Sequence, residues 1–148
     1  MKFATVLYDT SAFITYKKKI EQLPPPGWHS SVVLAELLIG VSGRSGIQTY
    51  RRIAADYEKR GRLLIPDLEA WLLAGQILNQ YLSDESRADS KRQRPKLESA
   101  EKQNLIRDVL IAVSAKKQGV TVISDNKDFR IIRRYYNFKH IPGKQFFA

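Results

Sequence analysis

The 148-residue sequence has no cysteine and only two histidines, His29 and His140. The missing cysteines exclude disulfides, thiolate nucleophiles and thiolate-bound zinc. The sequence also contains neither an HExxH nor a G-x-S-x-G motif, which argues against a zinc-peptidase helix and a Ser-His-Asp triad. Any chemistry of this chain is therefore expected to depend on carboxylates.

Long apolar runs are also missing, and none approaches the roughly 20 residues that a membrane-spanning helix needs. The first eight residues are too short for a secretory signal and lead directly into Asp9. We therefore expect a soluble cytoplasmic protein that does not bind membranes. By its length the chain is expected to form one domain, residues 1–148, large enough to bury a core.

Acidic residues are the minority among the charged ones, with 15 Asp and Glu against 25 Lys and Arg and a formal charge of +10. This excess favours a polyanionic partner, with nucleic acid ahead of a membrane surface, although charge can also serve solubility alone. The segment 83–103 is highly charged and almost without apolar residues. We interpret it as a solvated excursion, either a flexible loop or an arm that orders on phosphate.

The clearest pattern of secondary structure lies in the segment 104–129. Apolar residues recur at helical spacing up to Gly119, which is placed to end the helix, and residues 120–123 are typical of a strand buried in a parallel sheet. The helix would be roughly 20 Å long and the strand about 16 Å, so the chain nearly returns to its starting height. Asp108 and Asp125 should therefore lie together at the carboxyl edge of the sheet.

Strands and helices also alternate along the rest of the chain. Phe3–Tyr8 is predicted to be a strand that ends in an acid, Asp9, and Val32–Gly40 an apolar helix that contains Glu36. The segment 40–46 is rich in glycine but lacks a Walker lysine, so we interpret it as a helix exit and loop. Further elements are expected at residues 12–20, 47–60, 68–82 and 130–136 for helices, and at 28–30, 62–65 and 138–141 for strands.

The acids that follow these strands are expected to meet at one edge of the sheet. Each acid has an ordinary structural explanation, as a helix cap, a complement to a helix dipole or the partner of an arginine. Clustered carboxylates, however, repel one another unless a cation neutralises them, and an all-oxygen set suits Mg²⁺ or Mn²⁺. Such an ion can activate water for attack on a phosphodiester, while the basic surface holds the nucleic-acid backbone.

The sequence resembles the PIN-domain family, and within it the ribonuclease toxins of the virulence-associated protein C (VapC) type. The resemblance spans nearly the whole chain and rests on four motifs in order, which are YDTSAFI with Asp9, SSVVLAELLIG with Glu36, RDVLIAVSAKKQGVTVIS with Asp108, and SDNKDF with Asp125 and Asp128. It implies a three-layer α/β/α sandwich with a mainly parallel central sheet of about five strands. It also implies a Mg²⁺- or Mn²⁺-dependent endoribonuclease, the toxin of a bacterial or archaeal type II toxin–antitoxin module. Such toxins are usually homodimers, and a cognate antitoxin inhibits them by placing a peptide in the active-site groove.

The resemblance further assigns roles to individual side chains. The catalytic and metal-binding positions that it implies are Asp9, Glu36, Asp108 and Asp125. Glu36 would either bind metal or position the attacking water, and Asp128 is an additional candidate ligand. Family members often carry a threonine two residues before the fourth acid, whereas Ile123 stands there in this sequence with Ser124 beside it.

The leading hypothesis is metal-dependent hydrolysis of RNA, but other classes of function explain part of the pattern. A nucleic-acid-binding module with this fold and no catalysis would account for the charge, and it would show no saturable Mn²⁺ site. A related nuclease could act on DNA, which a comparison of RNA and DNA substrates would show. A structural interaction protein would instead associate with its partner independently of RNA and of salt.

Overall fold

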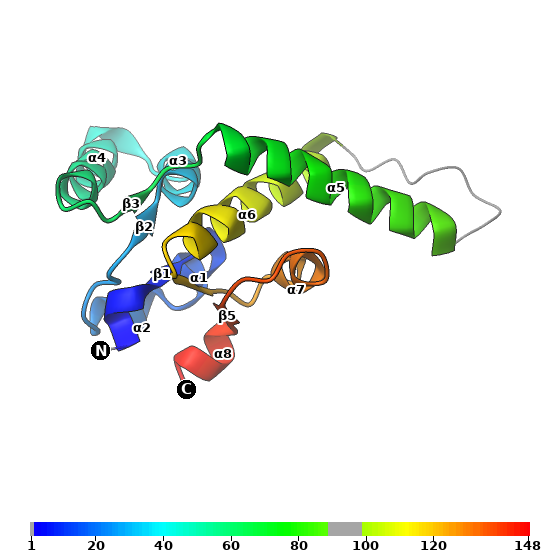
Figure 1. The fold of residues 1–148 in the computed structure, drawn as a ribbon. Coiled ribbons are helices and arrows are strands. Elements are labelled where there is room, and N and C mark those ends of the chain that lie inside the picture. The colour runs from blue at the N-terminus through cyan, green and yellow to red at the C-terminus, as the bar shows by residue number, and fades with distance from the viewer. Residues whose placement is uncertain (1, 89–98) are drawn as a thin grey trace.

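Short strands alternate with helices in the computed structural model, which describes residues 2–88 and 99–148 (Figure 1). The elements in chain order are η1 (Lys2–Thr5), β1 (Val6–Tyr8), α1 (Thr10–Thr15), α2 (Lys17–Glu21), β2 (His29–Ser30), α3 (Ser31–Ile39), α4 (Gly43–Lys59), β3 (Leu63–Leu64), α5 (Leu68–Ala88), α6 (Ser99–Lys117), β4 (Thr121–Ile123), α7 (Asp128–Arg133), β5 (His140–Ile141) and α8 (Gly143–Phe146). The predicted α/β class is confirmed. No helix in these described ranges is both long enough and apolar enough to cross a membrane.

The described strands all pair in parallel, but they form two sheets. The main sheet has the order β1-β4-β5, and β2 pairs with β3 in a smaller sheet. The main sheet therefore has three strands, fewer than the five or so that were expected. A backbone hydrogen bond from Trp28 N–H to Val6 C=O, 3.2 Å long, links the start of β2 to β1. Because these strands are only two or three residues long, the ladder does not continue across this junction.

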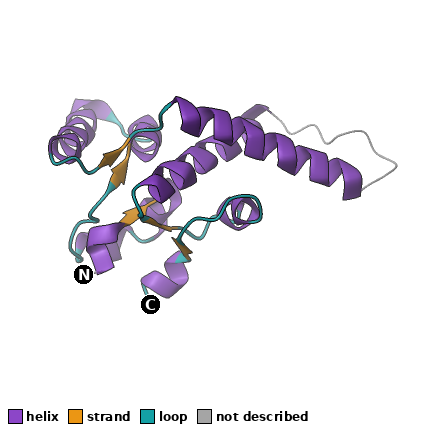
Figure 2. Cartoon of the chain, in the orientation of Figure 1, coloured by secondary structure: helices purple, strands orange, loops and turns teal. Residues whose placement is uncertain are grey.

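The main sheet separates two apolar cores, because successive side chains of a strand point to opposite faces. Leu7 and Val122 face the larger core, which is completed by α5, α6 and α7. Tyr8 and Ile123 face the smaller core, where they meet Phe146 of α8 and residues of α1. Figure 2 shows helices on both sides of the strands. The predicted three-layer α/β/α sandwich is thereby confirmed.

The boundaries near the N-terminus differ from the predictions. The strand predicted over residues 3–8 begins only at Val6, because the preceding residues form η1, where Phe3 C=O accepts a hydrogen bond from Gly27 N–H. The helix predicted over residues 12–20 is broken at Tyr16 into α1 and α2. The Tyr16 hydroxyl donates to the carboxylate of Asp125, so this break is joined to the end of the main sheet.

The glycine-rich loop and the C-terminus also differ from the predictions. The predicted loop 40–46 is shorter in the structure, because α4 already begins at Gly43, whose φ of 82° is readily available only to glycine. The short helix α8 was not predicted, since four residues give no measurable periodicity.

The segment predicted to be a charged excursion, residues 83–103, is helical at both ends. α5 continues to Ala88 and α6 begins at Ser99. The remaining part, residues 89–98, lies outside the described residues. The helical ends of this segment contain few apolar residues, so no helical periodicity indicated them in the sequence, and the interpretation of the remaining part stays a prediction.

The buried His29 is expected to make the protein sensitive to acid. Its ring stacks on Phe13 with the centroids 5.3 Å apart, and its Nδ1 accepts a 3.0 Å hydrogen bond from Ser30 N–H. Burial lowers the pKa of His29 from 6.5 to about 4. Between these values the unfolded chain binds a proton that the folded chain does not, so stability is lost as the pH falls through this window.

We expect this single group to remove about 3 kcal/mol from the free energy of unfolding between pH 7 and pH 4. Urea unfolding of the wild-type protein and His29→Gln at both pH values measures the effect. The glutamine variant should show the smaller acid-induced loss, and parallel losses in the two proteins would show that His29 is not the responsible group.

Candidate active site

A cavity of about 280 Å³ opens at the carboxyl edge of the main sheet. Segments far apart in the sequence supply its acids, because Asp9 follows β1, Glu36 lies on α3, Asp108 lies on α6, and Asp128 begins α7. The remaining lining residues are Thr10, Ser11, Ile14, Asn104, Ile111 and Asn126. The structure thus brings together Asp9, Glu36 and Asp108, three of the four acids that the sequence singled out, with Asp128, the additional candidate ligand.

Asp9 is held by several hydrogen bonds at the end of β1. Its carboxylate accepts from Ala12 N–H at 2.8 Å, which caps α1, and from the hydroxyl of Ser11 at 2.9 Å. The hydroxyl of Ser124 donates to it at 2.8 Å. Burial raises the pKa of Asp9, and the bonds from Ser124, Ala12 and Ser11 lower it. Asp9 is therefore a helix cap and a lining residue of the cavity at once.

Ser124 carries a hydroxyl next to the position, two residues before the fourth acid, where members of the family often have a threonine. Ile123 occupies that position and faces the smaller core. Ser124 is fully buried, and besides donating to Asp9 it accepts a 2.9 Å hydrogen bond from Asn126 N–H. The Asn126 side chain in turn accepts from Asp128 N–H at 3.0 Å. The side chains of Ser124 and Asn126, each bonded to the backbone two residues later, thus set the course of the chain after β4.

Asp108 has the most strongly raised pKa among the acids that line the cavity. Its side chain is buried, and burial raises its pKa to about 9. The neighbouring Asp128 contributes next to this rise in pKa, followed by Asp9 and then Glu36. The Asn126 amide donates a hydrogen bond to Asp108 at 3.4 Å. The carboxylates of the cavity therefore oppose one another's ionisation.

Glu36 is half-buried on α3, at the boundary between this cavity and a neighbouring groove. Burial raises the pKa of Glu36, the positive charge of Arg107 lowers it, and Asp9 raises it. An arginine, Arg107, thus affects the pKa of Glu36 through its charge. No ion pair with Glu36 is seen among residues 2–88 and 99–148.

Asp125 does not line the cavity. Its carboxylate accepts hydrogen bonds from the Tyr16 hydroxyl and, at 3.2 Å, from Lys144 N–H, so it joins the α1–α2 break to the start of α8. Asn126 and Asp128 occupy the side of the cavity where Asp125 was expected. No periodic pattern in the sequence indicated Asn126 and Asp128, because residues 124–127 belong to neither a strand nor a helix and local hydrogen bonds set their course.

The cavity is rich in carboxylate oxygens, which are the ligands that hard divalent cations prefer. As they stand, no three His, Asp or Glu side chains in the described ranges are close enough together to form a metal site. Mg²⁺, however, is usually bound through one or two carboxylates and retains several waters. The clustered acids, with the raised pKa of Asp108, fit an ion of that kind because its charge would offset their repulsion.

Comparisons with known proteins agree with this architecture. No curated protein matches the sequence. Among the solved structures that match is a chain of "Structure of FitAB bound to IR36 DNA fragment", at 16% identity and a TM-score of 0.54 over 93% of this chain and 94% of that chain. At this identity the likeness supports the fold alone. Residues 3–135 match the PIN domain family. The chain therefore belongs to the PIN-domain family, whose members are generally nucleases.

Proposed function

We propose that this protein is a metal-dependent endoribonuclease, the toxin of a type II toxin–antitoxin module, acting in the cytoplasm. The observation that carries the proposal is the buried cluster around Asp108, where burial first and then the neighbouring carboxylates raise the pKa of Asp108 to about 9. Such a cluster is costly without a cation and has no role in the packing of the core. Metal-assisted hydrolysis of a phosphodiester is the chemistry that explains it together with the +10 charge.

Asp9, Asp108 and Asp128 would hold Mg²⁺ or Mn²⁺, with Glu36 as a further ligand or as the group that positions the water. When bound, the ion would lower the pKa of a water molecule and stabilise charge on the phosphate. The chain's own groups prepare this site. Ser124 fixes the Asp9 carboxylate with its 2.8 Å hydrogen bond, and the half-buried Glu36 is placed to accept a proton from the attacking water.

The cavity continues into a groove of about 440 Å³ that could accept a partner peptide. The two hollows share Thr10, Ile14 and Glu36. The other lining side chains of the groove come from α1 to α4 and are mainly apolar, among them Phe13, Ile20, Leu37, Val41 and Ile53. We place the antitoxin peptide in this groove, where it would cover the carboxylates.

A separate apolar surface supports the proposed homodimer. It consists of Ile65, Leu68, Trp71 and Leu72, which all expose more than half of their surface. Positions 68, 71 and 72 lie on one face of α5. An apolar patch of this kind on a protein surface is typical of an interface.

The proposal is tested with purified protein, single-stranded RNA and DNA of the same sequence, and Mn²⁺ or Mg²⁺. We expect cleavage of RNA that EDTA abolishes and that Asp9→Asn lowers at least about 100-fold, as for loss of an electrostatic group in a catalytic site. Asparagine is also a good helix cap, so this variant should keep α1. The matched control is Asp125→Asn, which changes an acid outside the cavity and should cleave RNA within about threefold of the wild type.

Four outcomes would count against parts of the proposal. Cleavage that persists in Asp9→Asn would indicate a contaminating nuclease. A loss of RNA cleavage in Asp125→Asn as large as that in Asp9→Asn would show that Asp125 is a catalytic residue. Preferential cleavage of DNA would favour the alternative, a related nuclease that acts on DNA. Saturable binding of RNA, with no cleavage and no saturable Mn²⁺ site, would indicate a nucleic-acid-binding module.

A further inference from the structure

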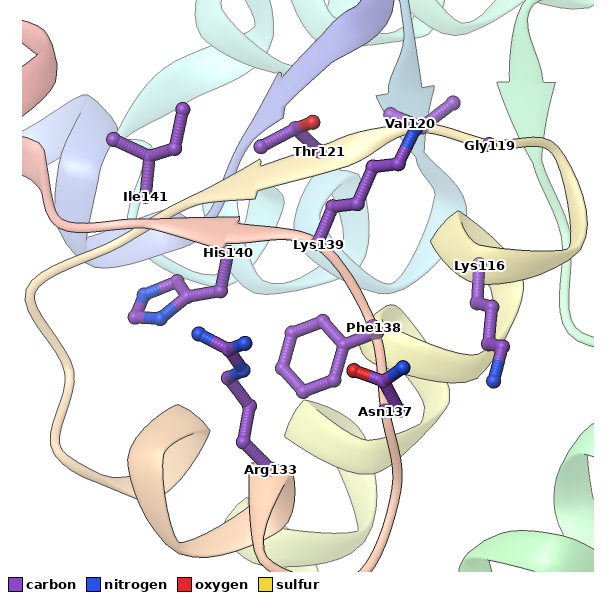
Figure 3. Close-up of a pocket in the computed structure, with 10 residues that line it drawn as sticks. All are labelled: Lys116, Gly119, Val120, Thr121, Arg133, Asn137, Phe138, Lys139, His140 and Ile141. Carbon is purple, nitrogen blue, oxygen red and sulfur yellow. The ribbon is translucent and has the colours of Figure 1, made fainter.

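A larger hollow, of about 610 Å³, lies toward the opposite end of the main sheet (Figure 3). The end of α6, the start of β4, the end of α7 and β5 enclose it. Lys116 lines this hollow and Asp108 lines the carboxylate cavity, and the two residues are about 12 Å apart along the axis of α6. The hollow is therefore distinct from the candidate active site.

Basic side chains surround this hollow, and no acid is among the residues that line it. The cations are Lys116, Arg133 and Lys139, and His140 lies beside them. In the described ranges none of the three forms an ion pair with an acid. Burial lowers the pKa of His140, and the charge of Arg133 lowers it further. A positive potential that is not neutralised within the protein is expected to attract an anion.

The shape and the remaining lining suit a ligand with a flat apolar part. The floor contains Val120 and Phe138, while Asn137 lies at the rim. Figure 3 shows the guanidinium of Arg133 extending from α7 toward the ring of His140, with the ring of Phe138 beside them. The Phe138 ring is buried and supplies an apolar floor, whereas the exposed guanidinium of Arg133 can stack on a nucleic-acid base and the cations can bind phosphate. The volume lies within the roughly 300 to 1,000 Å³ typical of small-molecule sites.

The basic surface also continues beyond this hollow. An adjoining open hollow of about 490 Å³ shares Arg133 and His140 with it and adds Arg130, Arg134 and Pro142. These arginines lie on or directly after α7, the helix whose first residue, Asp128, lines the carboxylate cavity. Basic groups thus extend along α7 from the candidate active site to the larger hollow.

We propose that the hollow around Arg133 and Lys139 is a nucleotide-binding site that holds a base and a phosphate of the RNA strand away from the bond that is cut. The identity of this strand rests on the proposed ribonuclease function. The proposal that the site binds a base and a phosphate does not rest on that function, because a free nucleotide offers the same two groups. The experiments must therefore distinguish an RNA strand from a mononucleotide as the ligand.

The first experiment measures binding of a labelled single-stranded RNA by fluorescence anisotropy in EDTA, over a range of salt concentrations. Arg133→Gln with Lys139→Gln is compared with Arg44→Gln and Lys59→Gln, two exposed positions on α4 outside the hollow. Both double variants lose the same charge. We expect the first to bind about 10-fold more weakly, with a salt slope lower by about 1.4, and the second to change less than about threefold.

The second experiment titrates adenosine 5′-monophosphate, and separately inorganic phosphate, into the wild-type protein in EDTA. Backbone amide resonances of Gly119 and Thr121, which line the hollow, report binding by NMR. Saturable shifts with the nucleotide, larger than those with phosphate, support the site. If the nucleotide binds but the RNA affinities of the two double variants are equal, the ligand is a free nucleotide.

Equal RNA affinities together with no shift at Gly119 and Thr121 would overturn the proposal. Thermal unfolding of both double variants shows whether each is folded, which is expected because all four substituted side chains are exposed. Cleavage is not measured in either experiment. A protein that fails to cut RNA would therefore refute the proposed function and leave this test intact.

Discussion

Asp108→Asn is expected to abolish RNA cleavage and, at the same time, to stabilise the metal-free protein. The carboxylate has a folded-state pKa of about 9, whereas the unfolded value is about 3.9. In this interval the folded chain binds a proton that the unfolded chain does not, so Asp108 reduces stability as the pH rises from 4 to 9. Asparagine occupies the same space without a charge and removes this cost.

We expect a gain of about 2 to 4 kcal/mol in the free energy of unfolding at pH 8 in EDTA, and a smaller gain at pH 5. Thermal and urea unfolding at both pH values measure it. Mn²⁺ should stabilise the wild-type protein by mass action and leave the variant nearly unchanged.

The matched control for this gain is Asp56→Asn, which also replaces an acid by its amide. Asp56 is exposed and pairs with Arg60 at 2.7 Å, so its substitution should change stability by less than about 1 kcal/mol. Unchanged or lower stability of Asp108→Asn at pH 8 would show that the carboxylates do not oppose one another. The argument for a bound cation would then lose its main support.

The helix and strand around Asp108 were predictable because their pattern is independent of the rest of the fold. Apolar residues at helical spacing and four consecutive β-branched residues before Ser124 identify α6 and β4. The rule that parallel strands place their carboxyl ends at one edge then brought Asp9 and Asp108 together. Glu36 was a further candidate for the same cavity, because a charged side chain among the apolar neighbours of α3 is expected to have a partner.

The course of the chain after β4 could not be obtained by counting residues from the strand. It depends on hydrogen bonds that backbone N–H groups donate to side chains. Asn126 N–H donates to the Ser124 hydroxyl, and Asp128 N–H donates to the side-chain oxygen of Asn126. These bonds turn positions 126 and 128 toward the cavity. Asp125 accepts hydrogen bonds from Tyr16 and from the backbone of α8, which are both distant in sequence. The local sequence pattern therefore could not predict these partners.

The largest loss of stability is expected for Gly27→Ala, at the entry to β2. A Cβ at this position would lie 2.0 Å from the carbonyl oxygen of Ala4 and 2.4 Å from its carbonyl carbon. These are backbone atoms, and they cannot move aside because Gly27 N–H also donates to Phe3 C=O at 2.6 Å. The added methyl group must therefore separate the chain before β2 from η1, which leads directly into β1.

We expect Gly27→Ala to lose about 3 kcal/mol in urea unfolding, the upper end of the range found when overpacking forces the backbone to shift. Gly75→Ala is the matched control, because a Cβ there meets nothing within 4 Å on α5. Alanine in an exposed helix interior should stabilise by about 0.5 to 1 kcal/mol, so the same chemical change has opposite signs at the two positions. A loss below about 1 kcal/mol at position 27 would mean that the backbone can separate there without disturbing the sheet, and the close contact between η1 and Gly27 would not be what aligns β2 with β1.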